Sequence, residues 1–476
     1  MMEMILTLRR QNRSGVDILN QKKFHMPTAY TILFLLLILV AAATWIIPAG
    51  SYDYVDGVPV AGTYHTVEQN PQGVGDVLKA AFSGFYDAVD VCIFILMVGG
   101  FLGVVMKTGA VDAGVANVIR LLGGREKWLI PILMLLFGLG GTTYGMWEET
   151  MAFYPLLIPV FLAAGYDAVV GISVILLGAG AGVIASTVNP FATGIAAGFA
   201  GVSLGEGIVL RLLEWVAFEA AAIWFVMAYA AKVKKNPSKS VVGVGAGKIQ
   251  VSMDQQVPFT PKRKVIMAIF TLTFLIMVYA VVPFDEMGLS LPALGWWFPE
   301  LSALFLVGGV VIGLIDRMGE EELVETYVAG CADLLGVAFI IGISRGITVL
   351  MNDGAITDTV LHWGEQALSG AGAISFTLLV FALYLPLTIL IPSSSGLATL
   401  SIPIVAPLGK FAGVGGDLVV TAFQSASGLV NILTPTAAVV MGALALGHVP
   451  YDRWVKYVWK LMAVFLLLAL GFLILG

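Results

Sequence analysis

The sequence predicts an all-α polytopic membrane protein of about nine spanning helices, built from two inverted repeats that each hold a re-entrant hairpin and a broken helix. Three observations predict this class. Of the 476 residues, 59% are hydrophobic and only 12% are charged, whereas about a quarter of a soluble protein is charged. Uncharged apolar runs recur along the chain, and its two halves share a pattern. A cytosolic enzyme, a nucleic-acid-binding protein and a disordered chain are thereby excluded.

Spanning helices are predicted where an uncharged apolar run reaches about 20 residues. Such runs occupy 28–48, 82–107, 168–201, 209–231, 264–283, 300–316, 330–351, 416–446 and 453–475. Cys92 and Cys331 both fall inside these runs. The sequence therefore predicts neither a disulfide framework nor a metal site.

Two other apolar stretches are too long for a single helix and carry a polar centre. The first, 128–165, is interrupted by Glu148 and Glu149, and the second, 366–409, holds no charged residue. Irregular backbone at membrane depth survives only where protein surrounds it or where it lines a cavity. We therefore predict two re-entrant hairpins, at 128–165 and 370–412. Their small, polar centres are Gly140–Thr143 and Pro392–Gly396.

The distribution of basic residues predicts the orientation in the membrane. If the N-terminus is inside, the outer segments hold only three basic residues, Lys79, Arg211 and Lys410. Most of the other basic residues cluster in the inner segments. This arrangement follows the positive-inside rule, and counting either hairpin as a full crossing would move basic loops outside. The sequence predicts a bacterial inner-membrane protein with a cytoplasmic N-terminus and a periplasmic C-terminus.

An internal repeat relates the two halves of the chain. Val105–Val111 matches Leu350–Ile356 at an offset of 245. An additional span at 300–316 inverts the second copy in the membrane. Two more pairs keep the same order and nearly the same offset, Ser83–Asp87 with Ala329–Asp333 and Asn189-Pro190 with Thr434-Pro435.

The repeat predicts the organisation of the chain. Inverted repeats with broken helices are typical of secondary transporters, whose substrate site lies near the midplane where the repeats meet. A break at a proline leaves backbone amides and carbonyls without helical partners, and these groups can bind anions and cations. The predicted parts are a cytoplasmic N-terminus (1–27), a first repeat (28–231) with hairpin 128–165, a basic cytoplasmic linker (232–264) and a second repeat (265–476) with hairpin 370–412.

Three short motifs add a family resemblance. Met26–Tyr30, Trp45–Gly50 and Gly145–Thr150, with the hairpins and broken helices, resemble the ion transporter superfamily, which includes the C4-dicarboxylate anaerobic and aminobenzoyl-glutamate carriers. Within it they resemble the YfcC-type family of basic amino acid antiporters. The resemblance implies a homodimer with scaffold contacts between subunits. The Ser-Asn-Thr sodium motifs of dicarboxylate relatives are not intact, since the tips read Thr142–Gly145 and Ser393–Gly396.

Glu148 and Glu149 are the leading site candidates, at the tip of the first hairpin. A carboxylate at membrane depth is costly and usually pairs with a substrate, an ion or a basic side chain. One of the two is expected to bind the ammonium or guanidinium group of a cationic substrate, or to take up a proton. The alternative is that one of them only caps the half-helix that follows.

The second tip and the two breaks supply further candidates. Ser393, Ser394, Ser395 and Gly396 precede a half-helix, and a helix N-terminus with hydroxyl groups suits a carboxylate. Their alternative role is capping alone. The remaining candidates, whose alternative role is simple turn or hinge chemistry, are Thr142, Thr143, Asn189, Pro190, Asn431, Thr434 and Pro435.

Arg345 is the only basic residue deep in a predicted span. It is expected to form a structural ion pair or to bind a substrate carboxylate directly. The partners considered for the ion pair are Glu214, Glu219 and Asp87 on neighbouring helices.

These features predict a secondary transporter that carries an amino acid, preferably a basic one such as arginine, ornithine or lysine, by exchange or proton coupling with elevator-type alternating access. The alternative is a proton- or sodium-coupled transporter of small carboxylates or C4-dicarboxylates. An enzyme is not expected, because no catalytic base lies near a nucleophile in the spans, and two closed tips disfavour a channel. H⁺ or Na⁺ is the expected coupling ion, with no other cofactor. The expected partners are a small-molecule substrate, the lipid bilayer and a second subunit, without nucleic acid.

Overall fold

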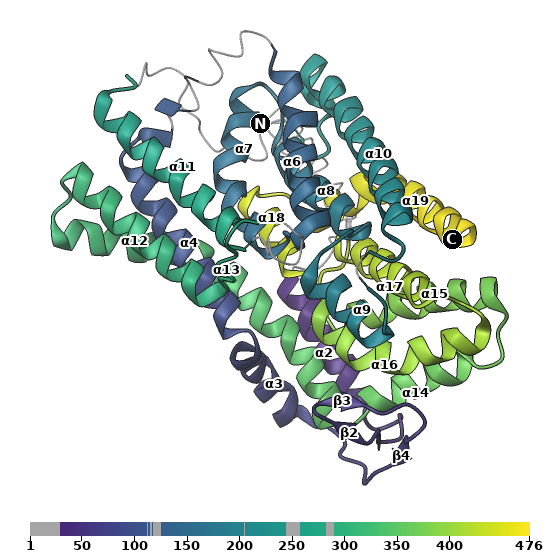
Figure 1. The fold of residues 1–476 in the computed structure, drawn as a ribbon. Coiled ribbons are helices and arrows are strands. Elements are labelled where there is room, and N and C mark those ends of the chain that lie inside the picture. The colour runs from purple at the N-terminus through teal and green to yellow at the C-terminus, as the bar shows by residue number, and fades with distance from the viewer. Residues whose placement is uncertain are drawn as a thin grey trace, which may run out of the picture.

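The computed structural model describes residues 29–111, 113–114, 117, 125–203, 205–243, 258–281 and 290–476. The predicted N-terminal segment 1–27 and the centre of the linker, 244–257, lie outside the described residues. Helices make up most of the described chain, and the predicted all-α class is confirmed (Figure 1).

The first half contains the helices that surround the first hairpin. They are α2 (Ala29–Ala43), α3 (Val74–Asp87), α4 (Val89–Lys107), η1 (Glu126–Trp128), α6 (Leu129–Tyr144), η2 (Glu148–Phe153), α7 (Tyr154–Ala163), α8 (Ala168–Ile184), η3 (Pro190–Gly194), α9 (Ile195–Ala200), α10 (Ile208–Lys235) and η4 (Pro237–Lys239).

The second half of the described chain is also helical. It contains α11 (Pro261–Val281), α12 (Phe298–Asp316), α13 (Glu320–Asp353), α14 (Thr357–Leu368), α15 (Ala373–Leu390), α16 (Ser394–Ala412), α17 (Gly416–Asn431), α18 (Ala438–Leu446) and α19 (Tyr451–Leu475).

The helices form two groups. In the first, α13 packs along α3 and α4, and α2, α11 and α12 join them. In the second, α8 packs against α6, α7, α10 and α17, with α15, α16 and α19 around them. Figure 1 shows α4, α11 and α12 on one side of the molecule and α8, α10 and α19 on the other. Every residue of α8 is buried, because this helix holds only small or apolar side chains and one serine.

Glycines bring α4 and α13 into backbone contact. A methyl group on Gly330 would lie 2.4 Å from the carbonyl oxygen of Gly99, and one on Gly99 would lie 2.5 Å from that of Gly330. In α3, a methyl group on Gly84 would likewise lie 2.1 Å from the carbonyl oxygen of Gly342 and 2.5 Å from the backbone nitrogen of Gly346. The two helical segments are therefore antiparallel, and positions related by the sequence offset of 246 exchange places across the contact. An inverted repeat predicts this reciprocity.

Helices long and apolar enough to cross a membrane fall in four of the predicted spans and in both predicted hairpins. Seven of the described helices are of this kind: Val89–Lys107, Glu126–Tyr144, Phe298–Asp316, Glu320–Asp353, Ala373–Leu390, Ser394–Ala412 and Tyr451–Leu475. The predicted span 82–107 is divided at Ala88, where φ is −123°. The sequence analysis missed α14 and most of α3, because these amphipathic helices contain no long apolar run. The count of nine crossings remains a prediction.

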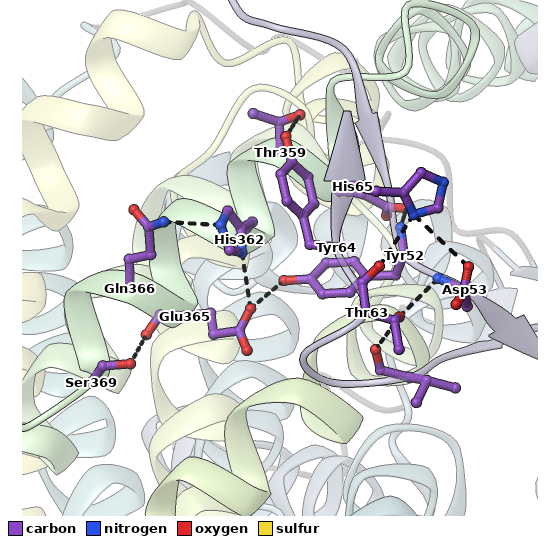
Figure 2. A network of polar contacts seen from close by, with 12 residues as sticks. Tyr52, Asp53, Thr63, Tyr64, His65, Thr359, His362, Glu365, Gln366 and Ser369 are labelled. Atoms are coloured by element: carbon purple, nitrogen blue, oxygen red, sulfur yellow. Dashed lines mark hydrogen bonds and ion pairs between the residues drawn. The ribbon is translucent and has the colours of Figure 1, made fainter. Parts of the chain in front are cut away.

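A polar network joins the segment after α2 to α14 (Figure 2). Two short antiparallel ribbons, β1 (Gly50–Ser51) with β4 (His65–Thr66) and β2 (Tyr54–Val55) with β3 (Val58–Pro59), form this segment. The Tyr52 hydroxyl donates to Glu365 Oε2 at 2.7 Å, His362 Nδ1 lies 3.0 Å from the same oxygen, and the Tyr64 and His362 rings stack at 4.0 Å.

The same network raises the pKa of two tyrosines in this segment. Burial, together with the hydrogen bond to Glu365, raises the pKa of Tyr52. Burial and the hydrogen bond to Asp358 likewise raise the pKa of Tyr54. Both hydroxyls therefore remain donors at physiological pH. Both α14 and β3 also contact α16 of the second hairpin.

The contact between α4 and α13 predicts a strong effect of one added methyl group. Gly330→Ala places its Cβ against the backbone of α4, which cannot turn aside as a side chain can. We expect a loss of about 1–3 kcal/mol and a lower midpoint of thermal unfolding, measured by size-exclusion chromatography of heated detergent-solubilised protein. Gly471→Ala is the control, since its Cβ meets nothing within 4 Å. Equal midpoints for the two variants would contradict the packing described.

Candidate functional site

The tip of the first hairpin begins where α6 ends. Gly145 stops the helix with φ of +78°, a conformation that favours glycine. A side chain there would also collide with Asn189, whose amide atoms would lie within 2.6 Å of the added Cβ. The chain then turns into η2, where Glu149 Oε2 accepts the backbone amide of Trp147 at 3.1 Å. The first tip is therefore packed directly on the break that follows α8.

The tip of the second hairpin is a helix N-terminus. Ser393 is the N-cap of α16, and its Oγ accepts the amide of Gly396 at 3.2 Å. Ser394 and Ser395 occupy the first turn of this 19-residue helix. Unpaired amides and the positive end of the helix dipole at such a terminus attract carboxylates.

The two predicted helix breaks lie at the expected places. Between α8 and η3 the chain leaves the helix at residues 185–189, and Asn189 Oδ1 accepts the amide of Ala192 at 3.3 Å. Between α17 and α18 it leaves the helix at residues 432–437, where the hydroxyls of Thr434 and Thr436 lie 2.8 Å apart.

Both tips and both breaks meet at one cavity of about 150 Å³. The long helices α4 and α13 and the start of α12 close its other side, so the cavity lies between the two helix groups. The predicted residues that line it are Glu148, Glu149, Asn189, Arg345, Ser393, Ser394, Ser395 and Asn431. The structure thus brings together residues that are up to 283 positions apart in the sequence.

The other predicted residues do not line this cavity. Thr142 is buried and its Oγ1 donates to the carbonyl of Ala185 at 2.7 Å, while Thr143 Oγ1 donates to its own helix. Gly396 and Thr434 serve capping and turn bonds. Pro435 is not among the lining residues, and the side chain of Pro190 lies outside the described part of the chain. These positions shape the tips and breaks, so their role as direct ligands remains a prediction.

Arg345 lines the cavity from α13 and has an acidic neighbour. Its Nε lies 3.7 Å from Asp87 Oδ2 at the end of α3. The prediction that Glu214 or Glu219 pairs with Arg345 was wrong. Both glutamates lie in α10, which packs on α6 and α8 in the other helix group. Arg345 is also close enough to Glu148 for their charges to interact.

The cavity therefore has an acidic part and a basic part. Glu148 and Glu149 enter from the first tip, and Glu149 is only 7% exposed. The guanidinium of Arg345 and the N-terminus of α16 contribute positive potential. Such a cavity can hold a small molecule that carries both a cationic group and a carboxylate. Within the described residues no group of three or more His, Cys, Asp or Glu side chains could hold a metal ion.

The sequence analysis missed several lining residues. Trp147, Ser344, Gln424 and Thr436 also face the cavity. Gln424 is 1% exposed, its Nε2 donates to the carbonyl of Val183 at 2.7 Å, and its Oε1 has no hydrogen-bond partner among the described residues. An amide within an apolar span was a usable signal, since polar groups in spans commonly mark function.

Comparison with known proteins identifies the family. The model of the C4-dicarboxylate anaerobic carrier family matches residues 26–476. An uncharacterised protein of Haemophilus influenzae is 35% identical over 94% of this chain and 96% of its own length. The Escherichia coli protein YfcC, provisionally named a basic amino acid antiporter, is 30% identical over 91% of this chain and 93% of its own.

Two solved structures are similar over most of their length. The YdaH transporter of Alcanivorax borkumensis is 13% identical, with a TM-score of 0.45 over 94% of this chain and 98% of that chain. MtrF of Neisseria gonorrhoeae, described with a class of antimetabolite efflux pumps, is 18% identical, with a TM-score of 0.44 over 97% and 96%. The family assignment rests on the sequence matches, which cover nearly the whole chain and confirm both the resemblance and the prediction of a transporter rather than an enzyme. The protein is a multi-pass membrane transporter of the C4-dicarboxylate anaerobic carrier family.

Proposed function

We propose that this transporter carries amino acids with a cationic side chain, of the arginine, ornithine or lysine type, by exchange or proton coupling. One observation carries the proposal, namely that two glutamates from the first hairpin tip and an arginine from α13 line the same cavity. The α-carboxylate of the substrate would face Arg345 and the serines of α16, and its cationic end would face Glu148 and Glu149. The name of the relative YfcC supports the same substrate class.

The proposal includes the setting of the protein. It lies in the bacterial inner membrane as a homodimer, with its N-terminus in the cytoplasm and its C-terminus in the periplasm. The group that holds both hairpins moves against α2, α3, α4, α11, α12 and α13 in an elevator-type cycle. The position of the cavity between the two groups supports this mechanism, because a relative movement there would change which side of the membrane the substrate can reach.

A small carboxylate is the second candidate substrate. The serines at the second tip and Arg345 would suffice to bind a carboxylate or C4-dicarboxylate. The family description favours this alternative, whereas the two glutamates in the cavity oppose it, since a second negative charge would meet them.

Exchange assays in proteoliposomes test the substrate class. We expect saturable uptake of radiolabelled arginine that internal ornithine or lysine accelerates, and little uptake of succinate. The charge pattern of the cavity is the physical reason. Uptake of succinate alone would favour the carboxylate alternative, and the absence of counterflow for every amine would exclude the main proposal.

Replacing the cavity glutamates tests the cationic end. Glu148→Gln keeps the shape of the side chain and removes its charge, so we expect the KM for arginine to rise about tenfold or more. Glu149→Gln should have a smaller effect, because its Oε2 already accepts the amide of Trp147. Glu322→Gln is the control, since that glutamate pairs with Lys107 at 3.7 Å on the surface. An unchanged KM in both cavity variants would remove the glutamates from the substrate site.

The carboxylate end is tested with an analogue that lacks the carboxylate. Arg345→Gln should weaken arginine binding about tenfold but leave binding of agmatine, the decarboxylated analogue, nearly unchanged. If Arg345 served only the ion pair with Asp87, the double variant with Asp87→Asn would restore arginine binding. Isothermal titration of the purified protein measures both ligands, and equal losses for arginine and agmatine would contradict a carboxylate contact.

A further inference from the structure

Besides the two glutamates of the cavity, another carboxyl group is buried behind the cavity, on α10. Glu214 is 0% exposed. Its Oε1 accepts the hydroxyl of Ser425 at 2.7 Å, and its Oε2 has no hydrogen-bond partner among the described residues. Ionisable groups buried inside membrane helices are costly and commonly serve proton pathways. The proposed substrate contacts do not use this group.

Glu214 is connected to the substrate cavity through two consecutive side chains of α17. Ser425 follows Gln424, which lines the cavity. Gln424 donates to the carbonyl of Val183 at 2.7 Å, and Ser425 Oγ lies 3.5 Å from the carbonyl of Ile184. Both carbonyls belong to the last turn of α8. This turn leads into the break that carries Asn189, so Glu214 contacts the structure that forms one wall of the site.

Few charged groups face Glu214. On its own helix Arg211 interacts electrostatically with Glu214, and Asp417 at the start of α17 interacts with the same arginine. The neighbouring helices α6 and α8 carry no acidic or basic side chain in their described residues, and the tyrosine at the end of α6, Tyr144, lies near Glu149.

The neighbouring part of α19 is also uncharged. In α10, Leu210 and Phe218 lie on either side of Glu214 along the chain. The ring of Phe465 packs on Phe218, and Gly476, directly after α19, lies beside Leu210. The segment 464–475 between them holds only apolar residues and one glycine. A proton that binds here therefore changes the local charge in a region of low dielectric constant, where the change has a large effect.

We propose that Glu214 is the site of the coupling proton, and that Ser425 transmits its protonation to α8. This proposal rests on the transport function proposed above and assigns its proton site. In the deprotonated state Ser425 donates its hydroxyl proton to the Glu214 carboxylate. When one proton binds, the carboxylic acid becomes a donor and gives its hydrogen bond to Ser425 Oγ. The hydroxyl proton of Ser425 then turns to the carbonyl of Ile184, and no covalent bond apart from the new O–H is made or broken.

The change has a consequence at the cavity. The hydroxyl of Ser425 is one donor, so it can serve either the carboxylate or the carbonyl of Ile184. Protonation of Glu214 thus adds a bond between α17 and the end of α8. Because Gln424 and Asn189 are held by these two segments, the occupancy of the proton site alters the wall of the substrate cavity. Such a link is a coupling free energy between two sites and acts in both directions.

Transport measurements separate proton coupling from substrate exchange. In proteoliposomes with an imposed pH gradient, Glu214→Gln should lower gradient-driven arginine uptake about tenfold while most arginine–ornithine counterflow without a gradient remains. Ser425→Ala should lose gradient-driven uptake as well. Glu219→Gln is the matched control, because Glu219 is a glutamate of the same helix, 2% exposed, that contacts Gly138 rather than a hydroxyl of α17. Unchanged gradient-driven uptake in Glu214→Gln would overturn the proposal.

Infrared difference spectra give a readout that needs no substrate. Spectra of the full-length protein at acid minus alkaline pH should contain a carboxylic acid C=O band that Glu214→Gln removes and that Ser425→Ala and Glu219→Gln retain. Persistence of every band in Glu214→Gln would overturn the proton site even if arginine exchange is observed. Loss of the band in a protein that transports no amine would uphold the proton site while the proposed substrate class fails.

Discussion

The structure depends on a rule for backbone groups at membrane depth, which must find partners within the protein because lipid offers none. At the two helix breaks, backbone carbonyl groups lose their helical partners. Side chains from other segments donate hydrogen bonds to these carbonyls. These bonds pass from Gln424 to Val183 O at 2.7 Å, from Thr142 to Ala185 O at 2.7 Å, from Trp454 to Ile432 O at 3.1 Å and from Tyr451 to Leu433 O at 2.8 Å. They join the first break to α6 and α17 and the second break to α19.

These bonds explain why the site lies where it does. Thr142 ties the first hairpin to the first break, and Gln424 ties α17 to the same segment. The second break is held from α19. Asn189 and Asn431, which lie beside these breaks, line the cavity. The charged residues that line the cavity are Glu148 and Glu149 from the first hairpin and Arg345 from α13.

Much of this arrangement could be predicted from residue patterns. The apolar runs located the helices, and the Ser-rich centre Pro392–Gly396 located the second hairpin tip, because irregular backbone needs small or polar residues there. The first predicted centre, Gly140–Thr143, was wrong in detail, since it lies within α6 and the chain turns only from Gly145 to Trp147. The charged residues inside the spans pointed to Glu148, Glu149 and Arg345. The partner of Arg345 could not be predicted, since Asp87, Glu214 and Glu219 are equally plausible until the packing of α3 and α10 is known.

The sequence by itself determined that the chain is a helical membrane protein, because composition and the periodic absence of charge follow directly from the solvent around each segment. It also determined which short segments break the helices, since proline, glycine and hydroxyl-bearing residues act locally. Only the tertiary structure decided which broken segments meet and which polar groups remain free. Those outcomes depend on close contacts such as Gly99 with Gly330 and Gly145 with Asn189, and contacts between distant segments leave no local pattern in the chain.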